Sequence, residues 1–180
     1  MENFIKGFFI LMFIGIIVEN INFIINVLFT IIFLIMLIYI CISFYKKMKK
    51  KRKIKRIINS GIDKIDKMTG IEFEKFLEHF MQKLGYKIIK RTNKTGDFGA
   101  DLIIKDNTDM KIAVQAKRHK NKVSLRAVQE VSAAKGYYDC PKGMVITNSH
   151  LTHPAKQLAR KNNIEYWERN TLIKKLNKAK

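Results

Sequence analysis

Apolar and polar positions divide the chain into an almost continuously apolar first part and a longer second part in which they alternate. Residues 23–45 read FIINVLFTIIFLIMLIYICISFY without a charged side chain, and a bilayer-spanning helix needs about 20 predominantly apolar residues. Residues 4–18 are also apolar, although Lys6 lies near their start. The polar stretch 19–22, ENIN, separates the two segments and suits a tight turn. The pattern therefore predicts an N-terminal transmembrane helical hairpin with helices at 4–20 and 23–45.

Two other interpretations of the first apolar segment stay open. A cleaved signal peptide would need a small-residue cleavage site after Val18, and none follows. A re-entrant segment would suit its length, which is slightly short for a full crossing. For residues 23–45, a buried core helix is a poor interpretation, because so small a domain could not cover every side of it.

Beyond residue 66 the apolar positions recur with helical and strand periods in turn. Thr69 and Glu72 form a capping-box pattern at the start of an amphipathic helix that Gly85 ends. The later predicted elements are strands at 86–91, 100–105 and 111–118, a helix from Ser124 as its cap to Tyr137, a strand at 143–147, a helix at 154–162, a strand at 164–167 and a helix at 171–177. This order, αβββαβαβα, predicts an α/β domain with a mixed central sheet flanked by helices.

Charge adds an orientation and a class of partner. The net charge is +20, and residues 46–180 hold 34 basic and 13 acidic residues. Nine of the eleven residues 46–56, KKMKKKRKIKR, are basic, so the positive-inside rule predicts that they and all that follows lie in the cytoplasm. This basic segment would also attract anionic membrane lipids. The predicted organisation is a membrane anchor (1–45), a basic juxtamembrane connector (46–66) and a folded domain (67–180).

So basic a domain suggests a polyanionic partner, either nucleic acid or an anionic membrane surface, although a lysine-rich solvated surface would have the same composition. Cys41 and Cys140 fall in unrelated contexts without metal-ligand spacing. They indicate neither a disulfide framework nor a zinc site, which fits a reducing compartment.

Candidate chemistry lies in the predicted hairpin of strands 100–105 and 111–118. Gln115 and Lys117 are two residues apart, so on a strand they point to the same face, and antiparallel pairing would bring Asp101 near them. Gly96 and Gly99 in the preceding loop would allow close backbone approach by a phosphate. Phosphodiester hydrolysis needs such a carboxylate, an oxygen ligand and a cation. The spacing by itself is better explained by a turn-capping aspartate, an incidental Gln115 and a solvated lysine.

The surroundings of these residues are more specific. The stretches GIEFEKFLEHFMQKLGYKIIKRTNKTGDFGADLII, AVQAKRHKNKVSLRAVQEV and GMVITNSHLTHPAKQLARKNNIEYW together resemble the Mrr-like restriction endonuclease family, a branch of the PD-(D/E)xK nucleases. The resemblance implies that Asp101 and Glu74 hold Mg²⁺, with Mn²⁺ as a substitute. It also implies that Gln115 occupies the second acidic position of the motif, where it assists the metal through its amide or a water, and that Lys117 is the motif lysine, which positions the nucleophile. Glu72 is the poorer choice for the helical glutamate because it fits the capping box.

The resemblance implies a restriction-endonuclease-like fold and a metal-dependent endonuclease that cleaves DNA in defence against foreign DNA. Together with the predicted N-terminal anchor, this gives a membrane-anchored endonuclease. Arg118, Lys120 and Lys122 would extend a DNA-binding rim beside the site. A non-catalytic, membrane-tethered nucleic-acid-binding module is the alternative. The recognition sequence, the dependence on DNA methylation, RNA as substrate and a homodimer all stay open.

Overall fold

The computed structural model describes residues 2–92 and 98–179, and the chain divides into two compact units, residues 1–50 and 51–180. The first unit is part of a single helix, α1 (Glu2–Ser60). The predicted transmembrane helical hairpin is therefore wrong. The stretch 19–22 has no proline or glycine, and its polar residues cost at most about 0.7 kcal/mol each relative to alanine in a helix, so nothing in it forces a turn.

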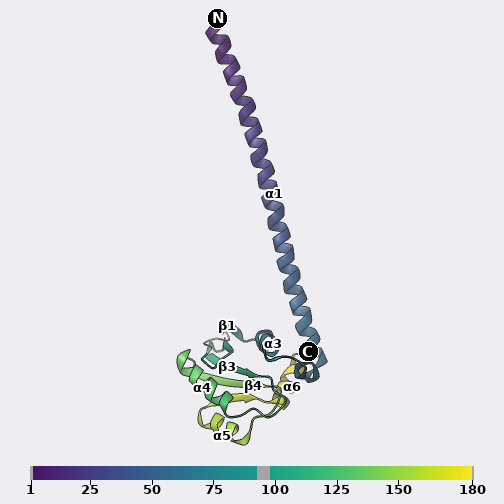
Figure 1. Cartoon of the computed structure of the whole chain (residues 1–180), viewed down its shortest axis with the longest axis vertical. Helices are drawn as coiled ribbons and strands as arrows, with labels where there is room; N and C mark the ends of the chain where they lie inside the picture. The colour runs from purple at the N-terminus through teal and green to yellow at the C-terminus, as the bar shows by residue number, and fades with distance from the viewer. Residues whose placement is uncertain (1, 93–97, 180) are drawn as a thin grey trace. The chain divides into compact units, whose positions relative to one another are not determined.

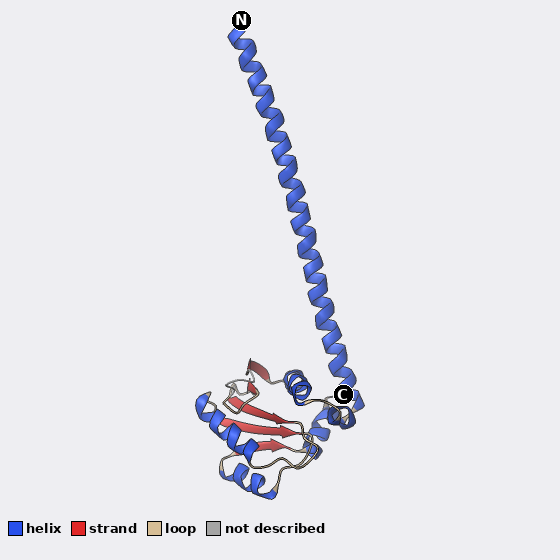
Figure 2. Cartoon of the chain, in the orientation of Figure 1, coloured by secondary structure: helices blue, strands red, loops and turns tan. Residues whose placement is uncertain are grey.

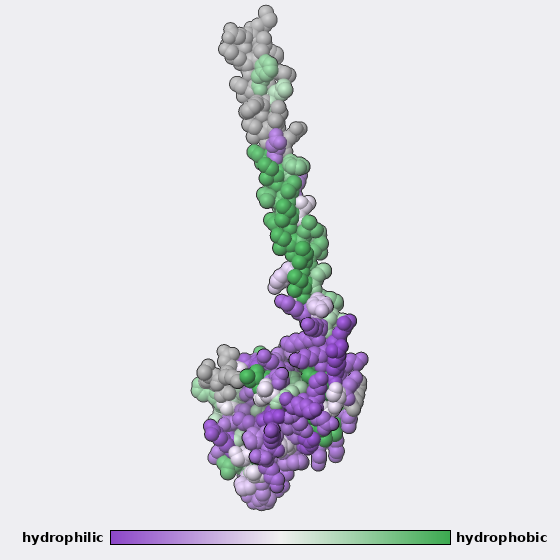
Figure 3. Space-filling view, turned by 45° about the vertical axis from the view of Figure 1, so that its right-hand side comes forward, coloured by the Kyte–Doolittle hydropathy of each residue, from purple (hydrophilic) through white to green (hydrophobic). Residues whose placement is uncertain are grey.

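The side chains from Asn20 to Lys50 are all exposed, and most of those before Lys46 are apolar. Figure 3 shows the hydrophobic surface that they form along this helix. By length and composition, one helical stretch among the described residues, Asn20–Ser60, could cross a membrane.

The second unit includes the last turns of α1, whose residues Ile57 and Ile58 are buried in a hydrophobic core. Gly61, with a φ of 72°, then ends α1, and the short helix α2 (Ile62–Asp66) follows. Ile65 of α2 is buried in the same core. Residues of the basic connector therefore contribute to the core of the folded domain.

The remaining helices and strands follow the predicted order, which is confirmed. They are α3 (Gly70–Lys83), β1 (Lys87–Arg91), β2 (Leu102–Lys105), β3 (Lys111–Lys117), α4 (Arg126–Tyr137), β4 (Lys142–Thr147), α5 (His153–Lys161), β5 (Ile164–Trp167) and α6 (Arg169–Lys178). Thr69 and Glu72 form both hydrogen bonds of the predicted capping box at the start of α3. The prediction that Ser124 caps α4 is wrong: Leu125 precedes the first turn, without a side-chain cap.

The five strands form one mixed sheet in the order β1-β2-β3-β4-β5, as Figure 2 shows. The first three strands pair antiparallel, whereas β3, β4 and β5 pair parallel. Helices cover both faces (Figure 1): α3 and α6 pack against one, and α4 and α5 against the other. Because side chains alternate along a strand, Val114 and Ala116 belong to the α3 core, whereas Ala113 belongs to the α4 core.

Candidate active site

The first feature of the site is the point where β2 begins beside β3. Leu102 pairs with Val114, so Asp101 lies opposite Gln115. Oδ2 of Asp101 accepts hydrogen bonds from Nε2 of Gln115 and from the backbone N–H of Ala116, both at 2.7 Å. The hairpin thus brings together two of the predicted site residues that are fourteen positions apart in sequence.

Gln115 is a buried polar residue with one amide atom left over. Its side chain lies on the α4 face of the sheet because it alternates with Val114 and Ala116, and the residue is only 3% exposed. While Nε2 donates to Asp101, Oε1 accepts no hydrogen bond from the described residues. An unsatisfied buried carbonyl costs about 1–3 kcal/mol, so this oxygen is available to a cation or to a water molecule.

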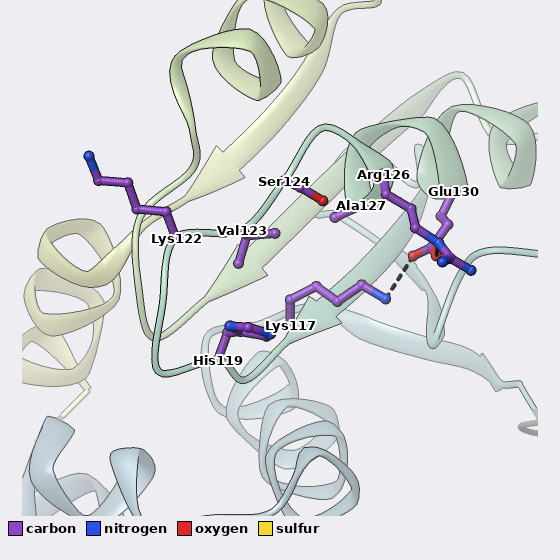
Figure 4. Close-up of a pocket in the computed structure, with 8 residues that line it drawn as sticks. All are labelled: Lys117, His119, Lys122, Val123, Ser124, Arg126, Ala127 and Glu130. Carbon is purple, nitrogen blue, oxygen red and sulfur yellow. Dashed lines mark hydrogen bonds and ion pairs between the residues drawn. The ribbon is translucent and has the colours of Figure 1, made fainter.

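Lys117 lies on the same face of β3, and its Nζ is 2.7 Å from Oε2 of Glu130. Glu130 projects from α4 and also accepts a hydrogen bond at 3.0 Å from Nε of Arg126, one helical turn before it (Figure 4). Sequence reasoning missed Glu130. Its spacing to Arg126 indicates only an ordinary helical ion pair, and its distance from Lys117 depends on how α4 packs.

Glu74 lies elsewhere in the described contacts. It is on α3, whose neighbouring residues Phe73 and Phe76 pack against the opposite face of the sheet, and its carboxylate is 3.7 Å from the guanidinium of Arg91. No group of three or more His, Cys, Asp or Glu side chains that could hold a metal occurs within residues 2–92 and 98–179. The role of Glu74 as a ligand therefore stays a prediction.

The basic residues predicted to bind DNA all lie in the loop that follows β3, but their side chains have different surroundings. Lys122 lines a cavity of about 480 Å³ together with Lys117 and Glu130, whereas Lys120 lines another of about 470 Å³. Arg118 points inward instead, and its Nη2 donates to the backbone carbonyl of Asp66. Gly96, expected to ease the approach of a phosphate, lies outside the described residues.

A polar network ties the end of β3 to the connector. Both carboxylate oxygens of Asp66 lie within 2.9 Å of Nη1 of Arg169, and Oδ1 also accepts from Nδ2 of Asn148 at 2.8 Å. Asn148, which is 4% exposed, accepts the backbone N–H of His119 through its own Oδ1 at 2.8 Å. The strand end that carries Lys117 is therefore held by residues from α2, α6 and the end of β4.

His150 lines the cavity of about 470 Å³ that Lys120 also lines, and its ring lies 3.8 Å from Glu168. Burial raises the pKa of the Glu168 carboxyl, but hydrogen bonds from Lys156 and from the backbone N–H of Leu151 and the charge of Lys156 outweigh it, so the pKa is lowered overall. Glu168 therefore stays ionised near the cavity at neutral pH.

The family described as restriction endonuclease (Mrr_cat) matches residues 65–176, more than half of the chain. The chain belongs to the Mrr-like restriction endonuclease family. The folded domain is a nuclease domain of that type, and the match covers Asp101, Gln115, Lys117 and Glu130. No curated protein matches the chain significantly.

The chain is also similar to several solved structures. The DNA modification-dependent restriction endonuclease AspBHI is similar with a TM-score of 0.54 and 17% identity over 68% of this chain and 35% of its own. A repair endonuclease from Pyrococcus abyssi gives a TM-score of 0.45 and 20% identity over 57% and 47%. EndoMS in its apo form gives 0.44 and 17% over 56% and 46%. The Mrr-like chain thus spans about half or less of the length of these proteins.

The residues of this Mrr-like site fit a hard divalent cation. Such ions prefer carboxylate and amide oxygens, and Mg²⁺ in particular keeps several waters and needs few protein ligands. Asp101 supplies a carboxylate, and the unpartnered Oε1 of Gln115 supplies an amide oxygen on the same face of the sheet. The donor set contains no sulfur or imidazole, which argues for Mg²⁺ or Mn²⁺ over softer metals.

Proposed function

We propose that this chain is a membrane-anchored, Mg²⁺-dependent endonuclease that hydrolyses phosphodiester bonds in DNA. The observation that carries the proposal is the buried Oε1 of Gln115, an oxygen without a partner among the described residues, beside a carboxylate in a nuclease-family domain. A folded domain tolerates such a buried oxygen most readily where a bound ligand serves as its partner.

In the proposed reaction, Asp101 and Gln115 hold the cation, with Glu74 as a further ligand. When bound, the cation would polarise the scissile phosphoryl group. Lys117, whose side chain is about one-third exposed, donates hydrogen bonds to the attacking water or to the phosphate oxygens, and its charge stabilises the negative charge that develops there. The basic surface, including Lys120 and Lys122, binds the DNA backbone, so affinity falls as salt rises.

The catalytic part is tested with the full-length chain in mild detergent, supercoiled plasmid, and either Mg²⁺, Mn²⁺ or EDTA. We expect nicked and linear plasmid with either metal and none with EDTA. Lys117→Ala should slow cleavage about a hundredfold or more because it removes a cation from the reacting phosphate. Lys111→Ala is the matched control, since it removes the same side chain from the other end of β3.

Cleavage by Lys117→Ala at the wild-type rate would remove Lys117 from the mechanism. Metal-independent DNA binding without any cleavage by the wild-type chain would favour a non-catalytic, membrane-tethered nucleic-acid-binding module instead. Parallel reactions on RNA and on methylated plasmid define the substrate. If the role is defensive, phage should form fewer plaques on cells that express the wild-type chain than on cells that express Lys117→Ala.

The membrane part rests on residues 23–45, which are helical, uncharged and exposed, and on the basic segment 46–56 that follows them. We expect the chain to remain in the membrane pellet after carbonate extraction. Protease added outside intact spheroplasts should leave the nuclease domain uncut, whereas protease added to inverted vesicles should digest it. Recovery of the full chain in the soluble fraction would contradict the anchor.

A further inference from the structure

Glu130 is an acidic residue where a DNA-binding surface would be expected to exclude one. It lines the cavity of about 480 Å³ beside Lys117, and its negative charge repels the phosphates that the neighbouring cations attract. In Figure 4 the side chain of Lys122 points away from Glu130, whereas Lys117 and Arg126 reach it. Glu130 must therefore contribute something that outweighs this repulsion.

The contacts of Glu130 indicate what that is. Its two oxygens have separate partners: Oε2 lies 2.7 Å from Nζ of Lys117, and Oε1 accepts from Arg126 at 3.0 Å. The side chain of Glu130 is only 26% exposed, and that of Lys117 is 32% exposed, whereas Arg126 is 83% exposed. The pair with Lys117 is thus less exposed to water than the pair with Arg126, and removal from water strengthens an ion pair.

The backbone of Glu130 is also held in place. Gly99, two residues before Asp101, has a φ of 89° and packs so closely on Glu130 that a Cβ there would overlap its backbone carbonyl. Val128 and Val131 on either side of it are buried in the core between α4 and the sheet. The segment that leads into β2 and carries Asp101 therefore packs tightly against the helix that carries Glu130.

We infer that Glu130 is a positioning residue that fixes the ammonium group of Lys117 beside Asp101 and Gln115. The inference rests on the proposed nuclease function for its kinetic consequence. A long lysine side chain samples many rotamers, and an ion pair to a fixed carboxylate selects one of them. A shift of the reacting group by about 1 Å costs roughly a hundredfold in rate, so the choice of rotamer matters for catalysis.

This role predicts opposite effects on binding and on chemistry. Glu130→Gln keeps the shape of the side chain but removes its charge. DNA affinity should stay the same or rise by up to about fivefold, since one negative charge leaves the binding surface. The single-turnover cleavage rate should fall about ten- to hundredfold because Lys117 is released. Glu130→Asp, which keeps the charge on a shorter side chain, should recover part of the rate.

The experiment uses the full-length chain in detergent. Affinity for a fluorescent DNA duplex is measured by anisotropy with Ca²⁺, and the cleavage rate is measured in single turnover with Mg²⁺. Glu78→Gln is the matched control, since it removes the same charge from α3 on the other face of the sheet. Circular dichroism identifies any variant that fails to fold. If Glu130→Gln fails to fold, the cleavage rate and DNA affinity of Glu130→Asp decide instead.

A second measurement does not depend on cleavage. Acylation of lysines by a limiting amine-reactive reagent is followed by mass spectrometry, and the labelling of Lys117 is compared with that of Lys122 in the same molecule. In Glu130→Gln the relative labelling of Lys117 should rise about threefold to fivefold, as expected for loss of one ion pair.

The inference is overturned if Glu130→Gln cleaves at the wild-type rate, or if its DNA affinity falls in step with its rate, which would indicate a structural role. Unchanged labelling of Lys117 also overturns it. If the wild-type chain cleaves nothing, the proposed function fails, and the labelling result still decides whether Glu130 holds Lys117.

Discussion

The network around Asp66 allows a quantitative prediction about stability. Asp66→Ala removes the acceptor for Nδ2 of Asn148, a residue that is 4% exposed, and an unsatisfied buried donor costs about 1–3 kcal/mol. It also removes the ion pair with Arg169, which adds at most about 1 kcal/mol because both side chains are 32% exposed. We therefore expect the free energy of unfolding to fall by about 2–3 kcal/mol.

Two further variants divide this value into its parts. Asp66→Asn keeps an oxygen acceptor and loses the charge, so it should cost about 1 kcal/mol or less. Asp63→Ala in the same helix α2, where the side chain is exposed, is the control and should change stability by less than about 0.5 kcal/mol.

The assay is urea unfolding of residues 51–180, the unit that contains all residues of both cores. The fluorescence of Trp167 reports the transition, because it is the one tryptophan of the chain and is 2% exposed. The reasoning is refuted if Asp66→Ala lies within 0.5 kcal/mol of the wild type, a limit of about the size of an exposed substitution. It is also refuted if Asp66→Asn costs as much as Asp66→Ala.

Three further predictions concern other contacts. Gly99→Ala should lower the free energy of unfolding by about 2 kcal/mol or more, measured in urea, because a Cβ would overlap the backbone of Glu130 at a positive φ. The lowered pKa of Glu168 stabilises the fold above pH 4.5, and this contribution is lost as the pH falls through the folded-state pKa. Glu168→Gln should therefore lower the melting temperature at pH 7, by an amount that shrinks as the pH is lowered below 4.5. A fragment of residues 61–180 lacks Ile57 and Ile58 and should melt well below residues 51–180, by circular dichroism, or fail to fold.

Much of the domain could be predicted from local sequence because its elements depend on local interactions. The capping box of Thr69 and Glu72 satisfies the first turn of α3 from within that turn. The alternation around Val114 assigns successive side chains of β3 to opposite faces, and the hairpin then brings Asp101 beside Gln115. These features were predictable because each involves neighbours along the chain or across a single hairpin.

The wrong prediction of a turn at residues 19–22 also came from a local pattern. Polar residues between two apolar segments fit a turn, but they also fit a helix when neither proline nor glycine interrupts it. Composition alone did not distinguish the two, and α1 continues through the stretch.

The amino-acid sequence by itself determined the class of the domain, the order of its elements and the apolar segment 23–45, and it singled out Asp101, Gln115 and Lys117 as predicted site residues. Only the tertiary structure decided that Glu130 is the partner of Lys117 and that Asp66 holds Arg169, which lies 103 positions away. Such contacts join helices that pack on the sheet to the ends of its strands. Their formation depends on which face of each helix is buried, and no local pattern encodes the facing residue on another element.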